Sequence, residues 1–590
     1  MSPAGDDGRT GTARGPRQAV AGVVRVLSPR GSLTLLPVDG AFAFALRAAL
    51  AMALPALVLA ATGRTEQAAY AMLGAFTTTF GRNLPYGRRA RALALVALAM
   101  TACVGGGSAL AAWAQHRADG VGAAVVVAAM ALVAGTAKYA CDAARLGGLG
   151  AVLLLFAFAA AANGAPAPAD VLPRTALAAA GAALAWVLAV VGRFVHPDRP
   201  QRLAVAAALR ALADLWDAPA PDHDGRRRHR ATAAVLRAHH ALGLPPRAAG
   251  GERHGEVCVR LTDLSWSLLI GSATRPPDAP TLLARRLRRQ ARVLADRRRR
   301  VPPLLLDPAS WAADARTGPA TEARTPSGPA GAVPSRSAEL RAAELVAGRH
   351  PGGPGHRSVL LVPALRIALG TGLAGGAALA LGLGHGYWAA VTAAAVLHSI
   401  NVRTATQRAV QRTLGTAAGL VLALAILALE PGPGALVAVI VALEFLLEYV
   451  VPRNYGLGVV FLTPLALLMT DLTAPQSAGT LVADRALASV LGIAVGLLCG
   501  LLVVHDRAVV RADRALAACT AAAARAEQVL ADGRAAAFPD AQARLAVTVV
   551  ELREADDAAA GEVWQAEIDP AELAAAEGRA HLLLERFAQV

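Results

Sequence analysis

The sequence contains little cysteine, and its cysteines do not form the pattern of a disulfide framework or a metal site. They are scattered along the chain, with no C-x-x-C pair and no histidine partner at metal-ligand spacing. The chain also has no phosphate-binding loop of the form GxxxxGK(S/T), no hydrolase elbow and no metal triad. We therefore expect no catalytic residues, no metal and no cofactor, which argues against an ATP-driven pump and against a soluble enzyme. The five cysteines are Cys103, Cys141, Cys258, Cys499 and Cys519.

Negative charge is also scarce, since 42 Asp and Glu residues stand against 58 Lys and Arg, for a net charge of +16. The arginines concentrate in loops, at the termini and in a central segment, without aromatic interleaving or a nucleic-acid-binding motif. We therefore expect no nucleic-acid partner, because basic loops of this kind are typical of the cytoplasmic side of a membrane protein. The first forty residues lack an apolar core followed by a small-residue cleavage site, so no cleavable signal peptide is expected.

Apolar residues are what the sequence has in excess, at 55% of the chain with a mean hydropathy of +0.45. They lie in long uncharged runs, which predict an all-α membrane protein with about 12 spans. The second span of each half is short, which predicts a helix buried among its neighbours or one that does not cross fully. The predicted spans are 41–61, 67–80, 92–114, 121–138, 147–163 and 175–195 in the first half, and 358–383, 386–400, 413–429, 434–451, 455–471 and 484–504 in the second.

Basic residues recur in every second loop, which predicts the orientation of the spans. The loop around Arg88, the loop with Lys138 and Arg145, and the end of the sixth span at Arg193 alternate with charge-poor loops such as NGAPAPADVLP. The second half repeats the alternation. Under the positive-inside rule both termini and the central segment are cytoplasmic, and the two six-helix halves are parallel in the cell membrane.

The regions outside the spans differ in composition from the membrane segments. Arg-rich amphipathic stretches between the halves, such as TLLARRLRRQARVLADRRRR, predict cytoplasmic helices that end in a disordered Pro/Gly/Ser/Thr linker. The domains are predicted as an N-terminal tail at 1–40, a first transmembrane bundle at 41–195, a basic cytoplasmic segment at 196–356, a second bundle at 357–505 and a C-terminal cytoplasmic helical segment at 506–590.

One pattern occurs twice: an apolar helix with a single arginine, a short aromatic-led apolar run and a basic loop. The first copy contains Arg47, Tyr70 and the loop GRNLPYGRRAR, and the second contains Arg366, the pair Tyr387-Trp388 and the loop NVRTATQRAVQR. Repetition of this kind predicts a similar bundle in each half of the chain.

The arginine in each copy has two interpretations. Either the side chain snorkels to the interface, or Arg47 and Arg366 face each other across a pseudo-twofold axis and attract an anion. In the second case hydroxyls and ring edges beside them would suit a carboxylate on an aromatic or apolar body. For the threonines alone, bonding to the helix backbone is the more common explanation. The side chains that would line the path are Thr77, Thr392, Tyr387 and Trp388.

Two carboxylates, Glu444 and Glu448, lie at i and i+4 in GALVAVIVALEFLLEYVVP and so on one helix face. Glu448 is near the cytoplasmic end and could pair with Arg453. Glu444 is deeper, which suits proton coupling, with a structural salt bridge as the alternative.

Glycines spaced by four residues occur in the ninth and the last predicted spans. Such spacing is typical of close helix packing in membranes, and a flexible gate is the alternative. The glycines are Gly415 and Gly419, and Gly492, Gly496 and Gly500.

The segment GYWAAVTAAAVLHSINVRTATQRAVQRTLGTAAG at 386–419 resembles the signature of the FUSC family, the fusaric acid resistance and aromatic acid exporter proteins. The segments at 453–469 and 484–496 resemble the following helices of that family, and the likeness covers nearly the whole chain, weakening in the first half and in the cytoplasmic pieces. It implies proton-driven efflux of aromatic or related organic acids, and a distant likeness to plant malate channels. Substrate-path roles carry over at Tyr387, Trp388, Thr392, Arg408, Arg412, Asn454 and Thr463.

Two rival interpretations remain. A major facilitator transporter also has two parallel six-helix halves, although GRNLPYGRRAR lacks the aspartate of that family's loop. A non-transporting membrane scaffold would instead use the basic cytoplasmic helices to bind anionic lipid or a partner. The expected partners are the lipid bilayer and a small organic anion, and a homo-oligomer is also compatible with the sequence.

Overall fold

The structure is a computed structural model of the 590-residue chain. It describes 40–114 except residue 83, 120–217 except 145, 147–149 and 165, 226–242, 280–296, 356–398, 402–502 except 474 and 475, 507–533, 537–559 and 570–589. Isolated residues at 35, 38, 298 and 303 and several between 258 and 268 are also described. The predicted disordered linker and most of the N-terminal tail lie outside the described residues.

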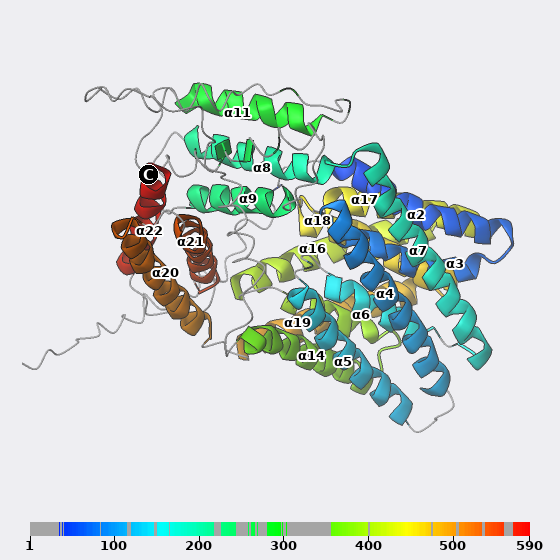
Figure 1. The fold of residues 1–590 in the computed structure, drawn as a ribbon. Coiled ribbons are helices and arrows are strands. Elements are labelled where there is room, and N and C mark those ends of the chain that lie inside the picture. The colour runs from blue at the N-terminus through cyan, green and yellow to red at the C-terminus, as the bar shows by residue number, and fades with distance from the viewer. Residues whose placement is uncertain are drawn as a thin grey trace, which may run out of the picture.

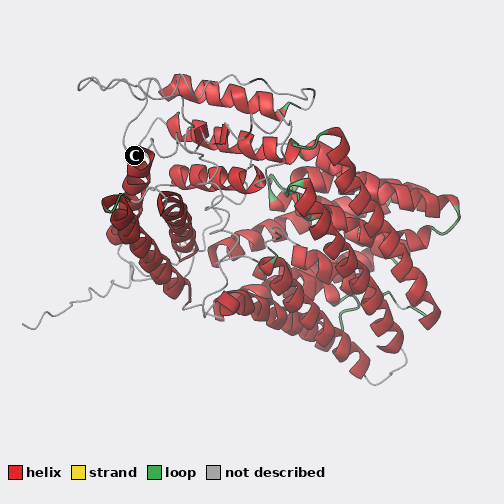
Figure 2. Cartoon of the chain, viewed as in Figure 1, coloured by secondary structure: helices red, strands yellow, loops and turns green. Residues whose placement is uncertain are grey.

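The described elements are all helical (Figure 2). Nine of them are long and apolar enough to cross a membrane: α2 (Ala41–Ala61), α4 (Tyr86–Ala114), α5 (Val121–Ala143), α7 (Val171–Val195, with η3 before it at Pro168–Asp170), α14 (His356–Ala380), α16 (Val402–Leu427), α17 (Pro433–Val450), α18 (Tyr455–Thr473) and α19 (Ala478–Leu502). The all-α prediction is confirmed for this part of the chain.

The other predicted spans are shorter helices. The first is α3 (Ala68–Ala75), which lies between the 3-10 turns η1 (Thr65–Gln67) and η2 (Phe76–Thr79); the others are α6 (Gly150–Ala162) and α15 (Tyr387–Leu397). All residues of α3 and α15 are buried. A helix surrounded by protein does not need the length that lipid demands, because its neighbours cover its ends.

The same helix pairings occur in both halves of the chain. In the first half α4 packs on α7 and α6, and α3 packs on α7; in the second α16 packs on α19 and α18, and α15 packs on α19. The halves meet through two matching contacts, α2 against α17 and α14 against α5. The first helix of each half thus packs on the fourth helix of the other (Figure 1).

Small residues bring the paired helices close together. A Cβ on Gly492 would lie 2.4 Å from the Ala389 carbonyl oxygen, and one on Gly415 would lie 2.5 Å from the Gly456 carbonyl oxygen. Neither position has room for a side chain, since real Cβ atoms do not come this near to backbone. Helices in lipid gain little from apolar contact, so backbone approach of this kind supplies much of their packing. Gly419 and Gly496 make similar close contacts, with Thr463 and Val396.

Two groups of amphipathic helices lie at one end of the membrane helices (Figure 1). The first group holds α8 (Arg199–Trp216), α9 (Arg226–Leu242) and α11 (Pro280–Ala295), which share one apolar core. In α8 the buried Val205, Leu209 and Leu212 recur at helical spacing, so one face is apolar. The second group, α20 (Arg507–Ala531), α21 (Phe538–Ala559) and α22 (Pro570–Gln589), has a core of its own.

Candidate functional site

A buried arginine on α19, Arg485, is the largest side chain that is fully enclosed among the described residues, with 1% of its surface exposed. Its guanidinium carbon lies 3.9 Å from the centroid of the Trp388 ring on α15, a cation–π contact. Nε and one terminal nitrogen have no hydrogen-bond partner. The ionisable groups that act on it are Arg412, Tyr387 and Tyr455, none of them a carboxylate. Arg485 is therefore a buried positive charge without a counter-charge among the described groups.

A second arginine, Arg412, lies in the same region on α16 and is 2% exposed. It donates hydrogen bonds to the Tyr455 hydroxyl at 3.1 Å and to Thr392 Oγ1 at 3.2 Å, while its Nε has no partner. One helical turn earlier, Arg408 places its guanidinium carbon 5.4 Å from the Tyr455 ring centroid. Three arginines from two helices thus follow one side of the second half, held by hydroxyls and aromatic rings.

Three buried hydroxyl groups on α19, α16 and α18 lack hydrogen-bond partners. Ser489 lies one turn after Arg485 and Thr416 one turn after Arg412, while Thr463 on α18 contacts the α16 backbone at Gly419. Buried polar groups are normally hydrogen-bonded, so a cluster of exceptions calls for a ligand or water. Together with the guanidinium nitrogens, these groups can donate several hydrogen bonds to an anion.

Aromatic rings place this region at the contact between the halves. Trp388 stacks on Phe156 of α6 at a centroid distance of 5.5 Å, and Tyr387 lies 4.6 Å from Trp388. Phe156 in turn meets Phe76 edge-on at 6.0 Å. The arginine cluster is therefore walled on one side by flat apolar surfaces to which both halves contribute.

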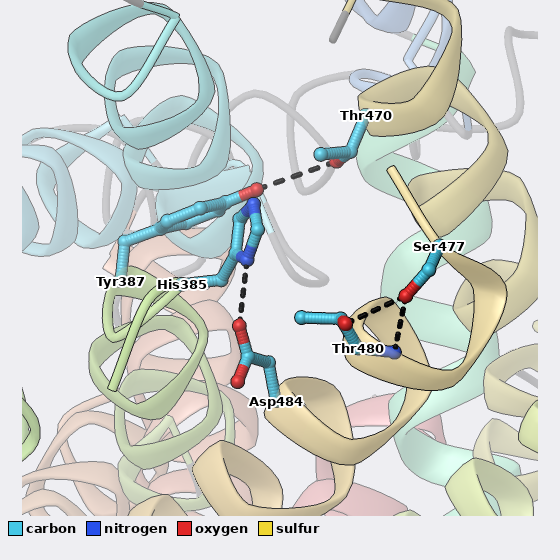
Figure 3. A network of polar contacts seen from close by, with 6 residues as sticks. All are labelled: His385, Tyr387, Thr470, Ser477, Thr480 and Asp484. Carbon is cyan, nitrogen blue, oxygen red and sulfur yellow. Dashed lines mark hydrogen bonds and ion pairs between the residues drawn. The ribbon is translucent and has the colours of Figure 1, made fainter. Parts of the chain in front are cut away.

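Further polar contacts lie around the start of α15 and the start of α19 (Figure 3). His385 Nδ1 lies 2.9 Å from Asp484 Oδ2, and the Tyr387 hydroxyl lies 3.4 Å from Thr470 Oγ1. The His385 and Tyr387 rings lie side by side, which joins the histidine–aspartate pair to the aromatic wall. Nearby, Ser477 and Thr480 share a hydrogen bond of 2.6 Å at the start of α19.

The first half contains a counterpart of the Arg485–Trp388 contact whose arginine is paired. Arg174 on α7 lies over the Tyr70 ring of α3 at 4.7 Å. It donates to the Gly164 carbonyl oxygen at 3.1 Å and lies 3.7 Å from the Asp170 carboxylate. The same position of the repeat thus carries a satisfied arginine in one half and an unsatisfied one in the other.

The two arginines that opened each repeat, Arg47 and Arg366, lie in different surroundings. Arg47 stacks on Phe44 and is close to Arg82 and Arg89. Arg366 donates to the Leu397 carbonyl oxygen at 3.3 Å. The structure thus groups Arg47 with other cations of the first half and sets Arg366 at the end of α15, and it does not bring the two together.

The carboxylates of α17 are both buried, Glu444 at 0% and Glu448 at 3% exposure. Neither carboxylate oxygen of Glu444 has a hydrogen-bond partner. Glu448 is within electrostatic reach of Arg82 and Arg47, and Arg82 donates to the Glu448 carbonyl oxygen at 3.3 Å. Glu448 therefore has cations beside it, whereas Glu444 is enclosed deeper on the same face.

Two further predicted path residues make local contacts. Thr77 Oγ1 donates to the Gly74 carbonyl oxygen at 2.8 Å, which is the backbone bonding that threonines in apolar helices commonly make. Asn454 Oδ1 accepts from the Leu457 backbone at 3.2 Å and so caps the start of α18. The Thr77 contact lies in the first half, whereas Asn454 directly precedes Tyr455, which accepts a hydrogen bond from Arg412.

Arg485 was missed by reasoning from the sequence, although a signal was present. It stands seven residues before Gly492, and Arg174 stands seven residues before Gly181. Each glycine packs against the helix that carries the aromatic partner, at Ala389 and Ala71 respectively. Aligning the halves on these glycines would have identified the repeated arginine.

Within the described part of the chain, no group of three or more His, Cys, Asp or Glu side chains is placed to hold a metal ion. The polar region of the second half is instead cationic, hydroxyl-rich and aromatic. Such a set of donors binds anions and not cations.

Residues 373–499 match the family model described as fusaric acid resistance protein-like, which confirms the family resemblance for this segment. A membrane protein of Bacillus subtilis strain 168, described as uncharacterized membrane protein YvaC, is 33% identical to this chain over 214 residues. The alignment covers 36% of this chain and 33% of that protein, so the chain spans about a third of its relative's length. No solved structure matches the chain. The chain is a multi-pass membrane protein, and its residues 373–499 are similar to the fusaric acid resistance protein-like family.

Proposed function

We propose that this protein is a membrane transporter that exports small organic anions, aromatic acids in particular, along the polar face of its second half. The observation that carries the proposal is the unpaired Arg485, fully buried beside Arg412 and stacked on Trp388. A buried charge inside a membrane bundle is costly unless it has a function or a partner. A carboxylate that visits the site supplies the missing partner.

The site has two parts that match the two parts of an aromatic acid. The guanidinium groups of Arg485 and Arg412, with the unpartnered hydroxyl of Thr463, offer donors to a carboxylate. The faces of Trp388 and Phe156 offer an apolar wall for a ring. An inorganic anion would use only the first part, so the aromatic wall favours an organic substrate.

We place the polypeptide in the cell membrane with two parallel halves of six helices and both termini in the cytoplasm. The matching contacts of α2 with α17 and of α14 with α5 support two equivalent halves, since a repeat puts equivalent helices into equivalent contacts. The alternation of basic loops supports their parallel orientation and the cytoplasmic termini. The proposal keeps the domain boundaries at 41–195 and 357–505 for the two halves. The short α3, α6 and α15 then lie within the bundle as its innermost helices.

The path runs along α15, α16 and α19 in this proposal. From the cytoplasmic end, Arg408 and Arg412 attract the anion, Arg485 and Trp388 hold it, and His385 with Asp484 stands at the outer exit. Arg366 on α14, which contacts Leu397 at the last residue of α15, would act at the cytoplasmic entrance.

Flux measurements on the purified full chain in proteoliposomes test this function. The quantity compared is the flux above that of protein-free vesicles. We expect this protein-dependent flux to be saturable for an aromatic carboxylate such as salicylate and much smaller for a neutral analogue such as salicyl alcohol. Equal rates for the acid and the alcohol, or no flux above protein-free vesicles across a panel of organic acids, would reject transport in favour of a membrane scaffold.

Proton coupling is assigned to Glu444 in this proposal. Its enclosed carboxyl has no hydrogen-bond partner and lies one turn from Glu448, which has Arg82 and Arg47 beside it. A carboxyl in such a place can carry a proton, because neither a salt bridge nor a hydrogen bond fixes its state of charge. We expect Glu444→Gln to abolish the stimulation of flux by a pH gradient while leaving exchange without a gradient intact. A Glu444→Gln protein that still responds to the gradient would rule out this role.

A further inference from the structure

A cavity of about 1180 Å³ lies between the first half and the soluble helices, away from the proposed transport path. Its walls come from the first turns of α2 and α4, the last turns of α5 and α7, and the facing sides of α8 and α9. All of these membrane helices begin or end there, so the cavity lies at one end of the bundle, where the soluble helices meet it (Figure 1). It exceeds the range of about 300–1,000 Å³ that is usual for small-molecule pockets.

The lining of this cavity is strongly basic. Its residues include seven arginines and one histidine, and no aspartate or glutamate is among them. The arginines come from three separate parts of the chain, so the charge is not a run in one solvated loop. They are Arg47 on α2; Arg82 in the turn before α4, with Arg88 and Arg89 in the first turn of α4; and Arg199, Arg210 and Arg237 on α8 and α9.

Several of these arginines are fixed in place by the fold. Arg89 donates to the carbonyl oxygens of Gly81 and Arg82 at 3.2 and 2.7 Å, and Arg82 lies over the Phe44 ring at 3.8 Å. Arg47 adjoins them, and its Nε is buried without a hydrogen-bond partner. The Glu448 carboxylate, which lies behind Arg82 and Arg47 and outside the lining, is the acidic group that acts on them. The group of Arg47, Arg82 and Arg89 with this one carboxylate therefore keeps a net positive charge.

The cavity also has an apolar side that faces the lipid. Leu46 and Leu50 on α2, Leu95 on α4 and Val191 on α7 all line it, and each is more than 40% exposed. Exposed leucine and valine on a membrane helix lie against acyl chains. An occupant can therefore enter from the bilayer with its apolar part along these side chains and its head among the arginines.

We propose that this cavity binds an anionic phospholipid, with its phosphate between the arginines of α4 and α8 and its acyl chains along α2, α4 and α7. Basic clusters at the ends of membrane helices attract anionic lipids with about 1 kcal/mol per arginine. The bound lipid joins α8 and α9 to the membrane helices, because its head contacts both groups. This site is independent of the proposed transport path, since Arg199, Arg210 and Arg237 have no part in it.

Lipid binding to the purified full chain in a neutral detergent tests this proposal. The probe is fluorescent phosphatidylglycerol, with phosphatidylcholine of the same chains as the zwitterionic comparison. We expect saturable binding of phosphatidylglycerol at least tenfold tighter than that of phosphatidylcholine. Inorganic phosphate and salicylate are added as competitors, and neither should displace the lipid. Equal binding of the two lipids would overturn the proposal, and so would displacement by phosphate or salicylate, which would make the cavity a site for free anions.

The variants remove charge inside and outside the cavity in equal amount. Arg199→Gln with Arg210→Gln removes two lining arginines, while Arg91→Gln with Arg193→Gln removes two exposed arginines that do not line it. We expect the first pair to weaken phosphatidylglycerol binding about 30-fold, or about fivefold for each arginine, and the second pair to change it less than threefold. Equal effects of the two pairs would show a general surface attraction and overturn the site.

A steric variant keeps the test decisive if the arginine variant unfolds. Ala207 on α8 is exposed and lines the cavity, so Ala207→Trp fills the space without disturbing the α8 core. We expect Ala207→Trp to lose phosphatidylglycerol binding at an unchanged helix content by circular dichroism. Full binding by the folded Ala207→Trp protein would contradict the proposed location.

Discussion

Replacing Arg485 with methionine separates a binding role of this arginine from a structural one. Arg485 is buried, its Nε and one terminal nitrogen have no partner, and the ionisable groups acting on it include no carboxylate. Exchanging even a paired buried charge for apolar side chains of similar volume is often neutral for stability or raises it by about 1–4 kcal/mol, and Arg485 has no ion pair to lose. We therefore expect Arg485→Met to unfold at the wild-type temperature or above it.

The same substitution should strongly weaken substrate binding. A hydrogen bond to a charged group contributes about 1.5–3 kcal/mol. Since each 1.4 kcal/mol is a factor of ten in affinity, loss of the Arg485 contact predicts about 10- to 150-fold weaker binding of an aromatic carboxylate. The assays are salicylate binding to the purified chain, followed by quenching of tryptophan fluorescence, and thermal unfolding of the same sample.

Arg174→Met is the matched control, because Arg174 occupies the equivalent place in the first half. It would lose the hydrogen bond to the Gly164 carbonyl oxygen and the ion pair with Asp170, which is weak because Asp170 is half exposed. We expect about 1 kcal/mol lower stability and less than a threefold change in affinity. A clear loss of stability in Arg485→Met with unchanged salicylate binding would refute the reasoning.

Further predictions concern packing and reactivity. Gly492→Ala should lower stability by about 1–3 kcal/mol, because its Cβ would lie 2.4 Å from a carbonyl oxygen. Gly376→Ala is the control and should be tolerated, since nothing lies within 4 Å of a Cβ there. Equal unfolding temperatures of the two variants would contradict the α15–α19 contact. Cysteines introduced at Ala131 and Gly372 should form a disulfide under mild oxidation, because a Cβ on Gly372 would lie 3.3 Å from the Ala131 Cβ. Absence of this cross-link on a gel would contradict the packing of α14 on α5. Burial raises the pKa of the Cys258 thiol to about 12, so almost no thiolate is present at pH 8. A maleimide should therefore modify Cys258 only after denaturant is added. Rapid labelling of Cys258 in the folded chain would contradict the α8–α9–α11 core.

The helices were predictable because an apolar run is a local property of the sequence. The predicted 41–61 is α2 as observed, and the predicted 434–451 differs from α17 by a single residue at each end. Span length was less predictable: the predicted 147–163 is the shorter α6, which packs on α4, α5 and α15. Neighbours of this kind cover the ends of a helix, and they are known only once the helices are packed.

Which helices pack side by side could not be predicted from the sequence. The contact of α2 with α17 joins segments almost 400 residues apart, and lipid-facing and protein-facing sides of a membrane helix are equally apolar. The repeated Arg47 and Arg366 look equivalent as sequence, yet the turn that holds Arg82 and Arg89 lies beside Arg47, while Arg366 meets the end of α15. Arg47 and Arg366 occupy equivalent positions of the repeat, but different segments of the chain lie beside them.

The candidate site was predictable in part. Arg412, Thr392 and Trp388 stood in a motif that could be recognised, and the first two share a hydrogen bond. Arg485 lies near the start of its helix, where a lone arginine normally reaches the membrane interface. Its burial results from α14, α15 and α16 packing on α19, which no local pattern records.

Equilibrium binding of radiolabelled benzoate to the purified chain tests the central claim most directly, with the wild type compared with the Arg412→Met Arg485→Met variant. The account predicts one saturable site in the wild type and in Arg174→Met, and no measurable site in the double variant at an intact fold. Benzoate binding of equal affinity in the wild type and the double variant would contradict it.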